Sequence, residues 1–211
     1  MNPFHTAPLH AVEVRVLGSL LEKESTTPEY YPLTVNALVN ACNQKSSRDP
    51  IVQYDDATVE AALDTLRQKG LVLKISGAGH RVEKYAHRLG ETLNLGRREL
   101  ALLCVLMLRG AQTVGELRGR TERMHAFEDL DEVERLLEHL ATREPEPLVA
   151  RAARGRWAHL LSGEFVEDAA PETAAIPALP PRPDLEARME ALEHEVEQLK
   201  QQWESFRRQF E

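Results

Sequence analysis

The sequence predicts a mainly α-helical fold with small β-hairpins: two tandem winged-helix domains, then a proline-rich linker and a C-terminal coiled-coil helix. Two repeated segments support this prediction. Residues 33–38 resemble residues 112–117, which lie 79 positions later, and residues 84–89 resemble residues 156–161, which lie 72 positions later. Two matches in the same order at nearly one offset indicate an internal duplication. Each copy predicts three helices followed by two strands, which is the order of a winged helix.

The first copy, residues 1–92, contains three helical patterns. Apolar residues recur at helical spacing over residues 10–23 and predict its first helix. Thr34 is placed to cap a short second helix. Asp55 or Asp56 begins the third helix, in which apolar residues fall at i, i+3, i+4 and i+7. We therefore expect the apolar faces of these helices to form a core.

Two strands complete each copy. In the first copy, residues 71–75 and 82–85 predict a hairpin with a glycine-rich tip. The second copy, residues 93–163, repeats the pattern: its first helix ends at Gly110, and Thr113 caps a short second helix. A third helix and another hairpin follow, so the two copies have the same predicted element order.

The C-terminal residues differ in composition from both copies. Residues 164–183 carry five prolines and predict a stiff linker. Residues 184–211 place apolar side chains alternately four and three positions apart, as in a coiled coil. The sequence favours a homodimer through this helix, while packing within the chain and a foreign helical partner stay open. The expected dimer contacts are Leu185, Met189, Leu192, Val196, Leu199 and Trp203.

The charge distribution neither demands nor excludes nucleic acid. The formal net charge is −8, but residues 1–163 sum to −1 and residues 164–211 to −7. Acidic residues such as Asp64 and Glu138 also follow the expected outer faces of the two third helices. Because DNA is a polyanion, these faces are poorly suited to enter its major groove. We therefore expect any DNA contact to come from loops and hairpins.

Basic and amide residues gather in the loops after the second helices and in the two hairpins. Phosphate contacts from such residues would position DNA without specifying its sequence. The alternative for the cations is a solvated surface with local ion pairs, and for the amides it is a structural role in capping and loop closure. The candidates for nucleic-acid binding are Asn43, Gln44, Lys45, Ser46, Arg48, His80, Arg81, Arg118, Arg120, Arg123, Arg151, Arg154 and Arg156.

The sequence offers no pattern typical of an enzyme. It has no phosphate-binding glycine loop with a lysine, no glycine-flanked nucleophilic serine and no metal-ligand spacing, so we expect no catalytic residue, metal or cofactor. Cys42 and Cys104 lie in apolar helical patterns, which favours buried thiols over a disulfide. There is no apolar run of membrane-spanning length and no secretory signal, so we expect a cytoplasmic protein without membrane contact.

Two segments resemble motifs of the bacterial YceH family, which has no established activity. The first is residues 30–50, and the second runs from Gly115 to Arg118 and from Glu122 to Phe127. The resemblance covers residues 10–163 and implies two winged-helix domains in one cytosolic chain, but no substrate, cofactor or catalytic residue. If the motifs mark a working surface, residues 43–48 and 118–127 are the segments expected to form it, as one composite surface across the two copies.

Two functional classes follow from these observations. The leading hypothesis is a DNA-associated, transcription-regulatory protein that touches double-stranded DNA through basic loops and wings. The competing hypothesis is a protein–protein interaction adaptor that uses the same scaffold without binding DNA. A continuous positive face across both copies would favour DNA, whereas isolated basic islands beside an exposed apolar groove would favour a protein partner.

Overall fold

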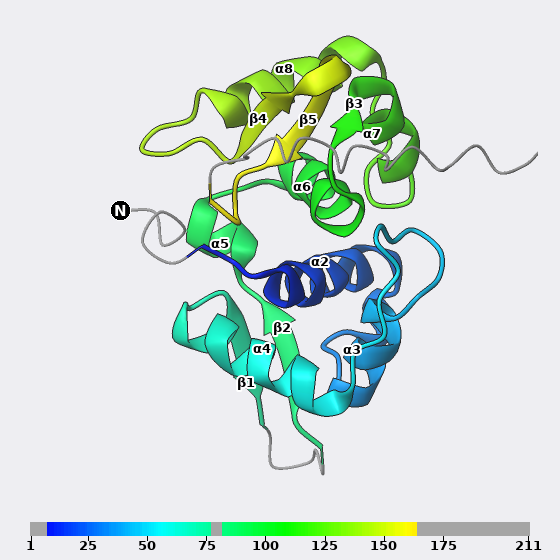
Figure 1. Ribbon diagram of the computed structural model, residues 1–211, viewed down its shortest axis with the longest axis vertical. Helices are drawn as coiled ribbons and strands as arrows, with labels where there is room; N and C mark the ends of the chain where they lie inside the picture. The colour runs from blue at the N-terminus through cyan, green and yellow to red at the C-terminus, as the bar shows by residue number, and fades with distance from the viewer. Residues whose placement is uncertain (1–7, 77–81, 164–211) are drawn as a thin grey trace, which may run out of the picture. The chain divides into compact units, whose positions relative to one another are not determined.

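The computed structural model describes residues 8–76 and 82–163, which are mainly helical with small antiparallel sheets (Figure 1). The elements of the first copy are α2 (Ala11–Thr26), η1 (Pro28–Tyr30), α3 (Val35–Cys42), α4 (Asp56–Gln68), β1 (Val72–Ile75) and β2 (Lys84–His87). A short helix that the sequence patterns did not predict, α5 (Leu89–Leu93), leads to the second copy. The elements that follow are α6 (Arg97–Arg109), β3 (Gln112–Thr113), α7 (Val114–Thr121), α8 (Leu130–Ala141), β4 (Val149–Ala152), η2 (Ala153–Gly155) and β5 (Arg156–His159).

Polar side chains cap the helices at the predicted positions. Thr34 and Asp55 each accept a hydrogen bond from the backbone amide three residues later, at 3.3 and 2.9 Å. At the start of α7, Thr113 accepts from the Glu116 amide at 3.2 Å, and the Glu116 carboxylate accepts from the Thr113 amide at 2.9 Å. These bonds satisfy amides that helix geometry leaves unpaired. The predicted caps are therefore confirmed.

Equivalent strand pairings recur in the two copies. β1 and β2 are antiparallel, and Leu33, just before α3, bridges to Tyr85 on β2. In the second copy, β3 lies beside β5 and pairs Gln112, just before α7, with Trp157. Tyr85 and Trp157 are 6% and 2% exposed. The two aromatic residues thus occupy corresponding buried positions, as the repeat in the sequence requires.

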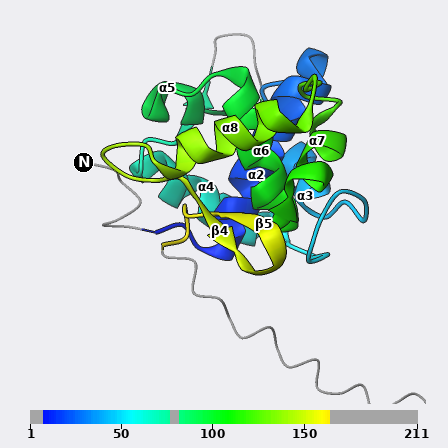
Figure 2. The same cartoon turned by 90° about the horizontal axis from the view of Figure 1, so that it is seen from above.

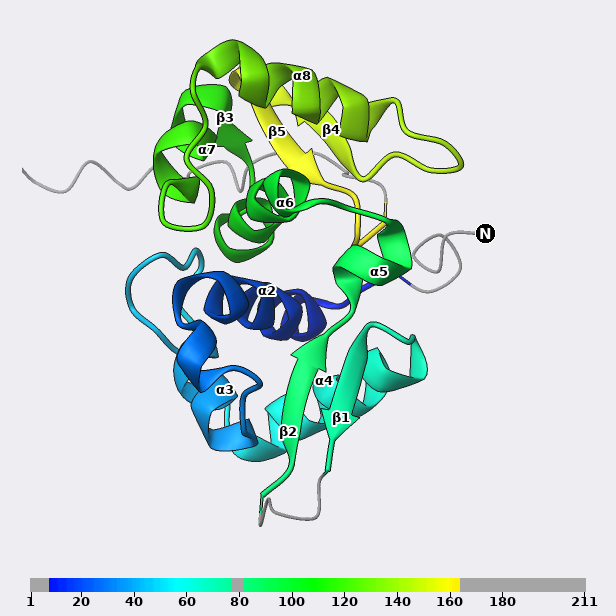
Figure 3. The same ribbon diagram turned by 180° about the vertical axis from the view of Figure 1, so that it is seen from behind.

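α2 and α6 pack directly against each other between the other elements of the two copies (Figures 1 and 3). Gly18 on α2 permits this approach, because a Cβ there would lie 3.0 Å from Leu108 Cδ2 and 3.2 Å from Met107 Cβ. The Cys104 thiol donates to the Gly18 carbonyl at 3.4 Å. Buried apolar residues of both copies consequently form one continuous core. The sequence-predicted boundary between residues 92 and 93 falls at the end of α5, and no gap in the core accompanies it.

The predicted linker, residues 164–183, and the predicted coiled coil, residues 184–211, lie outside the described residues. The six predicted dimer contacts, Leu185, Met189, Leu192, Val196, Leu199 and Trp203, lie there as well. They stay predictions from the sequence.

Candidate functional site

The loops that follow α3 and α7 meet on one side of the α2–α6 pair. α3 and α7 lie on this same side in all three ribbon views (Figures 1, 2 and 3). A hollow of about 200 Å³, here called the seam hollow, is lined by both loops together with the C-terminal ends of α2 and α6. Residues 43–48 and 118–127, predicted from the sequence as one composite surface, both contribute to its lining. The lining residues that matter below are Glu22, Lys23, Gln44, Arg109, Arg120 and Arg123.

Positive charge dominates the seam hollow. Among the described residues, four cations line it (Lys23, Arg109, Arg120 and Arg123), and Glu22 is the single acidic one. Arg109 is half-buried, and burial, followed by the nearby positive charges of Arg120 and Arg48, lowers its pKa from the ordinary value. The hollow therefore favours an anion on electrostatic grounds.

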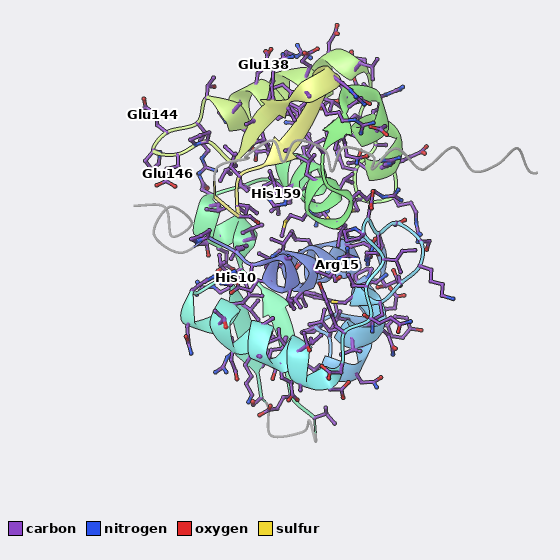
Figure 4. All side chains as sticks on the ribbon, in the orientation of Figure 1. His10, Arg15, Glu138, Glu144, Glu146 and His159 are labelled. Carbon is purple, nitrogen blue, oxygen red and sulfur yellow. The ribbon has the colours of Figure 1, made fainter. Side chains whose placement is uncertain are left out.

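Two buried arginines hold the loop after α3 against α2. The Arg48 guanidinium donates to both carboxylate oxygens of Glu22, at 3.0 and 2.7 Å, and to the Ala41 carbonyl at 3.2 and 2.8 Å. Arg15, which Figure 4 labels on α2, donates to the Pro50 carbonyl at 2.6 Å. Arg48 is 6% exposed, so the sequence-predicted phosphate contact is an internal anchor in this structure.

Glu22 keeps its charge beside Arg48. Burial raises the pKa of the Glu22 carboxyl, but the hydrogen bonds and charge of Arg48 outweigh burial and leave the pKa below its ordinary value. Lys23 lies 3.1 Å from the same carboxylate. Both Glu22 oxygens are therefore already occupied by donors, and this residue cannot fully neutralise the other cations of the hollow.

The amide candidates of the same loop also make internal contacts. Asn43 donates to the Tyr54 carbonyl and accepts from the Tyr54 amide, both at 2.8 Å, which closes the loop between α3 and α4. Gln44 accepts hydrogen bonds from Lys23 at 3.3 Å and from Arg48 at 3.2 Å. The exposed candidates of this loop are Lys45 and Ser46.

The candidates on and after α7 divide into engaged and exposed cations. Arg118 donates to two backbone carbonyls of the following loop, at 2.9 and 3.4 Å. Glu116 pairs with Arg120 at 3.3 Å and with Arg156 of β5 at 2.9 Å. Arg123 is exposed and makes no ion pair with a described residue. Only part of the predicted basic cluster is thus available to an outside anion.

The second hairpin shows the same division. Arg151 lies 3.0 Å from Glu134 and 3.2 Å from Glu138, so two carboxylates of α8 surround its charge. Arg154 sits at the hairpin tip with φ 57°, and it is exposed. His80 and Arg81, the candidates of the first hairpin, lie outside the described residues.

The outer faces of the third helices are acidic, as predicted. Glu60 and Asp64 are exposed on α4, and Asp131 and Glu138 are exposed on α8. Figure 4 shows Glu138 on the outer side of α8. α4 and α8 also lie on opposite sides of the α2–α6 pair (Figures 1 and 3). The outer faces of α4 and α8 are therefore acidic, and the two helices do not form one shared surface.

Two histidines occupy matching strand positions with different surroundings. His87 Nε2 lies 2.8 Å from a carboxylate oxygen of Glu24. His159 Nδ1 is shielded from solvent and has no hydrogen-bond partner among the described residues, and burial lowers the pKa of His159 to about 4. His87 is thus tied to α2 by a side-chain contact, whereas His159 is a buried neutral imidazole.

Metal binding and membrane insertion find no support within the described part of the chain. It holds no group of three His, Cys, Asp or Glu side chains able to bind a metal ion. None of its helices is both long and apolar enough to cross a bilayer.

Two cations of the seam hollow, Lys23 and Arg109, were not predicted from the sequence. Each follows a buried apolar run and so marks a helix end near the surface, which was the available signal.

The comparisons with known proteins identify the family. The family model described as "Protein of unknown function, DUF480" matches residues 9–156, and the chain belongs to this family. A UPF0502 protein of Solibacter usitatus is 54% identical over 208 residues, covering 96% of this chain and 98% of that protein. The UPF0502 protein YceH of Salmonella newport is 46% identical over 211 residues, covering 93% and 95%. The resemblance to the YceH family is thereby confirmed.

Proposed function

We propose that this chain is a cytoplasmic, DNA-associated regulatory protein built from two winged-helix units, and that it acts by binding rather than catalysis. The repeated order of three helices and a hairpin supports the winged-helix assignment. The observation that carries the proposal is the meeting of the loops after α3 and α7 at one cationic surface. Arg123 lies exposed at this surface, and Lys45 is exposed in the loop after α3. Both would contact backbone phosphates, whereas Arg120 is already paired with Glu116.

The proposed contact differs from the usual insertion of a third helix into the major groove. α4 and α8 present carboxylates, and attraction to phosphate would have to overcome their repulsion. They also face away from each other across the α2–α6 pair (Figure 1). Contacts through the loop cations therefore predict binding with strong salt dependence and little sequence preference.

We further propose that residues 184–211 join two chains in a parallel coiled coil. In this register Arg188 would face Glu193, and Glu195 would face Lys200, so both interchain pairs are attractive. Two chains would present two cationic surfaces to one duplex. A chain ending at Pro183 should therefore be monomeric in sedimentation equilibrium, and an unchanged dimer mass would refute this assignment.

The central test is binding of a random-sequence duplex by the full chain, measured by fluorescence anisotropy across a salt series. Removing one cation that binds a phosphate should reduce the slope of log affinity against log salt by about 0.9. The double variant K45Q/R123Q should therefore weaken binding and lower the slope by about 2. The matched control R97Q/R135Q removes two exposed arginines from α6 and α8 and should change the slope less.

Two outcomes would overturn the DNA proposal. One is no binding by the parent chain at low salt, and the other is equal binding by the parent and K45Q/R123Q. Either result would favour the adaptor hypothesis, for which the first hairpin gives a specific observation. Leu73, Ile75 and Val82 are 45%, 38% and 58% exposed there, beside the acidic α4. Exposed apolar side chains of this kind mark protein-interaction surfaces.

A further inference from the structure

We propose that the seam hollow is a binding site for a small phosphorylated molecule, whose phosphoryl group is held by Arg109, Arg123 and Lys23. This inference goes beyond DNA association and does not require it. The site is built from both copies, because Lys23 belongs to α2 while Arg109 and Arg123 belong to α6 and the turn after α7.

The size of the hollow suits a small ligand. Its volume of about 200 Å³ is below the range of roughly 300–1,000 Å³ that accommodates drug-sized molecules. One water takes roughly 30 Å³ of liquid volume, so the hollow has room for a phosphoryl group and a few further atoms. A large cofactor would extend far outside it.

The charge balance selects an anion with more than one negative charge. Four cations and one carboxylate line the hollow, and Glu116 outside the lining pairs with Arg120, so Lys23, Arg109 and Arg123 are the cations left for a ligand. Glu22 cannot offset these three charges, since Arg48 already donates to both of its oxygens. A phosphate monoester carries between one and two negative charges at neutral pH, and its oxygens accept the forked donors of arginine well.

The individual cations differ in how free they are. Arg120 is paired with Glu116 at 3.3 Å, and Lys23 approaches Glu22 at 3.1 Å. The guanidinium groups of Arg109 and Arg123 make no hydrogen bond or ion pair with a described residue, and the backbone carbonyl of Arg109 accepts from Gln112. Arg109 is also half-buried. Burial is the largest cause of its lowered pKa, and the neighbouring positive charges are the next. A cation in such a position gains most from a bound anion, because water screens it poorly.

Two further features fit a phosphoryl ligand. Ser46 and Ser47 line the hollow with hydroxyl groups that are exposed and able to donate hydrogen bonds to phosphate oxygens. The ligand would also touch α2 of the first copy and α6 of the second. Binding would therefore stabilise the packed arrangement of the two copies, and it should raise the melting temperature of the chain.

The test uses pyrophosphate as the probe, with inorganic phosphate as a smaller analogue, titrated into the full chain by calorimetry at constant ionic strength. We expect saturable binding tighter than about 1 mM and a raised melting temperature. R109Q and R123Q should each weaken binding at least tenfold, and R109K should retain more affinity than R109Q. R135Q, which removes an exposed arginine from α8, should bind as the parent does. Because Arg123 is exposed, R123Q tests the site without disturbing the core.

A second arm separates a small-molecule phosphate from a DNA backbone phosphate. Pyrophosphate binding that persists in a chain unable to bind duplex DNA supports the small-molecule site alone. R109Q removes a cation that the DNA proposal does not use, so it should lose pyrophosphate binding and keep duplex binding. Equal loss of pyrophosphate and duplex binding in R109Q would identify the DNA backbone as the source of the phosphoryl group and would overturn the small-molecule assignment. No saturable binding of pyrophosphate, or equal binding by R109Q, R123Q and the parent, would refute the site altogether.

Discussion

Replacing Arg48 with Met should destabilise the fold strongly. The Arg48 side chain has 0% exposure, and its guanidinium holds Glu22, whose side chain has 14% exposure. Removing one partner of a buried ion pair typically costs about 3–5 kcal/mol, because the other charge stays buried without compensation. Glu22 is partly reached by water, so we expect a loss of about 3 kcal/mol. For a chain of this size, that corresponds to a fall in Tm of roughly 6–12 °C.

Urea unfolding of the parent, R48M, E22Q and the double variant E22Q/R48M would measure this effect. The double variant should recover part of the loss, since it leaves no buried charge alone. The pair also gives a pH signature: the pKa of Glu22 is lowered in the folded chain, so its contribution is present at neutral pH and is lost as pH falls through that lowered value. R135M, an exposed control on α8, should change stability by less than about 0.5 kcal/mol. A loss below about 1 kcal/mol in R48M, or no recovery in the double variant, would refute this account and return Arg48 to the surface candidates.

Two further predictions concern the core. Gly18→Ala should destabilise the chain by about 1–3 kcal/mol, because the new Cβ would crowd Leu108 and Met107. A Cβ at Gly115 on α7 would have no atom within 4 Å, so Gly115→Ala should be neutral or stabilising in the same urea assay. Equal losses of stability in the two variants would count against close α2–α6 packing. The pKa of His159 falls from 6.5 to about 4 on folding, so the unfolded chain takes up this proton first as pH falls. The parent should therefore lose about 3 kcal/mol relative to H159Q as pH drops from 6.5 to 4, and parallel stability curves would disprove the buried neutral imidazole.

The sequence predicted the helices well because their signals are local. Thr34, Asp55 and Thr113 cap helices through bonds to residues three positions away, so chain order alone locates those helix starts. The packing of α2 on α6 depends on contacts between distant residues, such as Gly18 with Leu108. The apolar run of residues 101–108 is the signal from which burial of α6 could have been predicted, since a helix that is apolar on all sides must be covered on all sides.

The candidate site was predictable only in part. Residues of the two loops predicted as one composite surface line the same hollow, and each loop follows the second helix of its copy. Whether a given arginine faces solvent depends on which carboxylate lies beside it in space. Arg48 meets Glu22, 26 positions earlier, and Arg151 meets Glu134 and Glu138, so these charges are satisfied internally. Arg123 and Lys45 meet no such partner among the described residues, and nothing in their local sequence distinguishes them from Arg48.

The contact between α2 and α6 has a consequence for how the two copies unfold. Separating them would expose to water the apolar surface around Gly18, so the loss of either copy would uncover the other. Residues 8–163 should accordingly unfold in one calorimetric transition, and two resolved transitions would contradict this coupling.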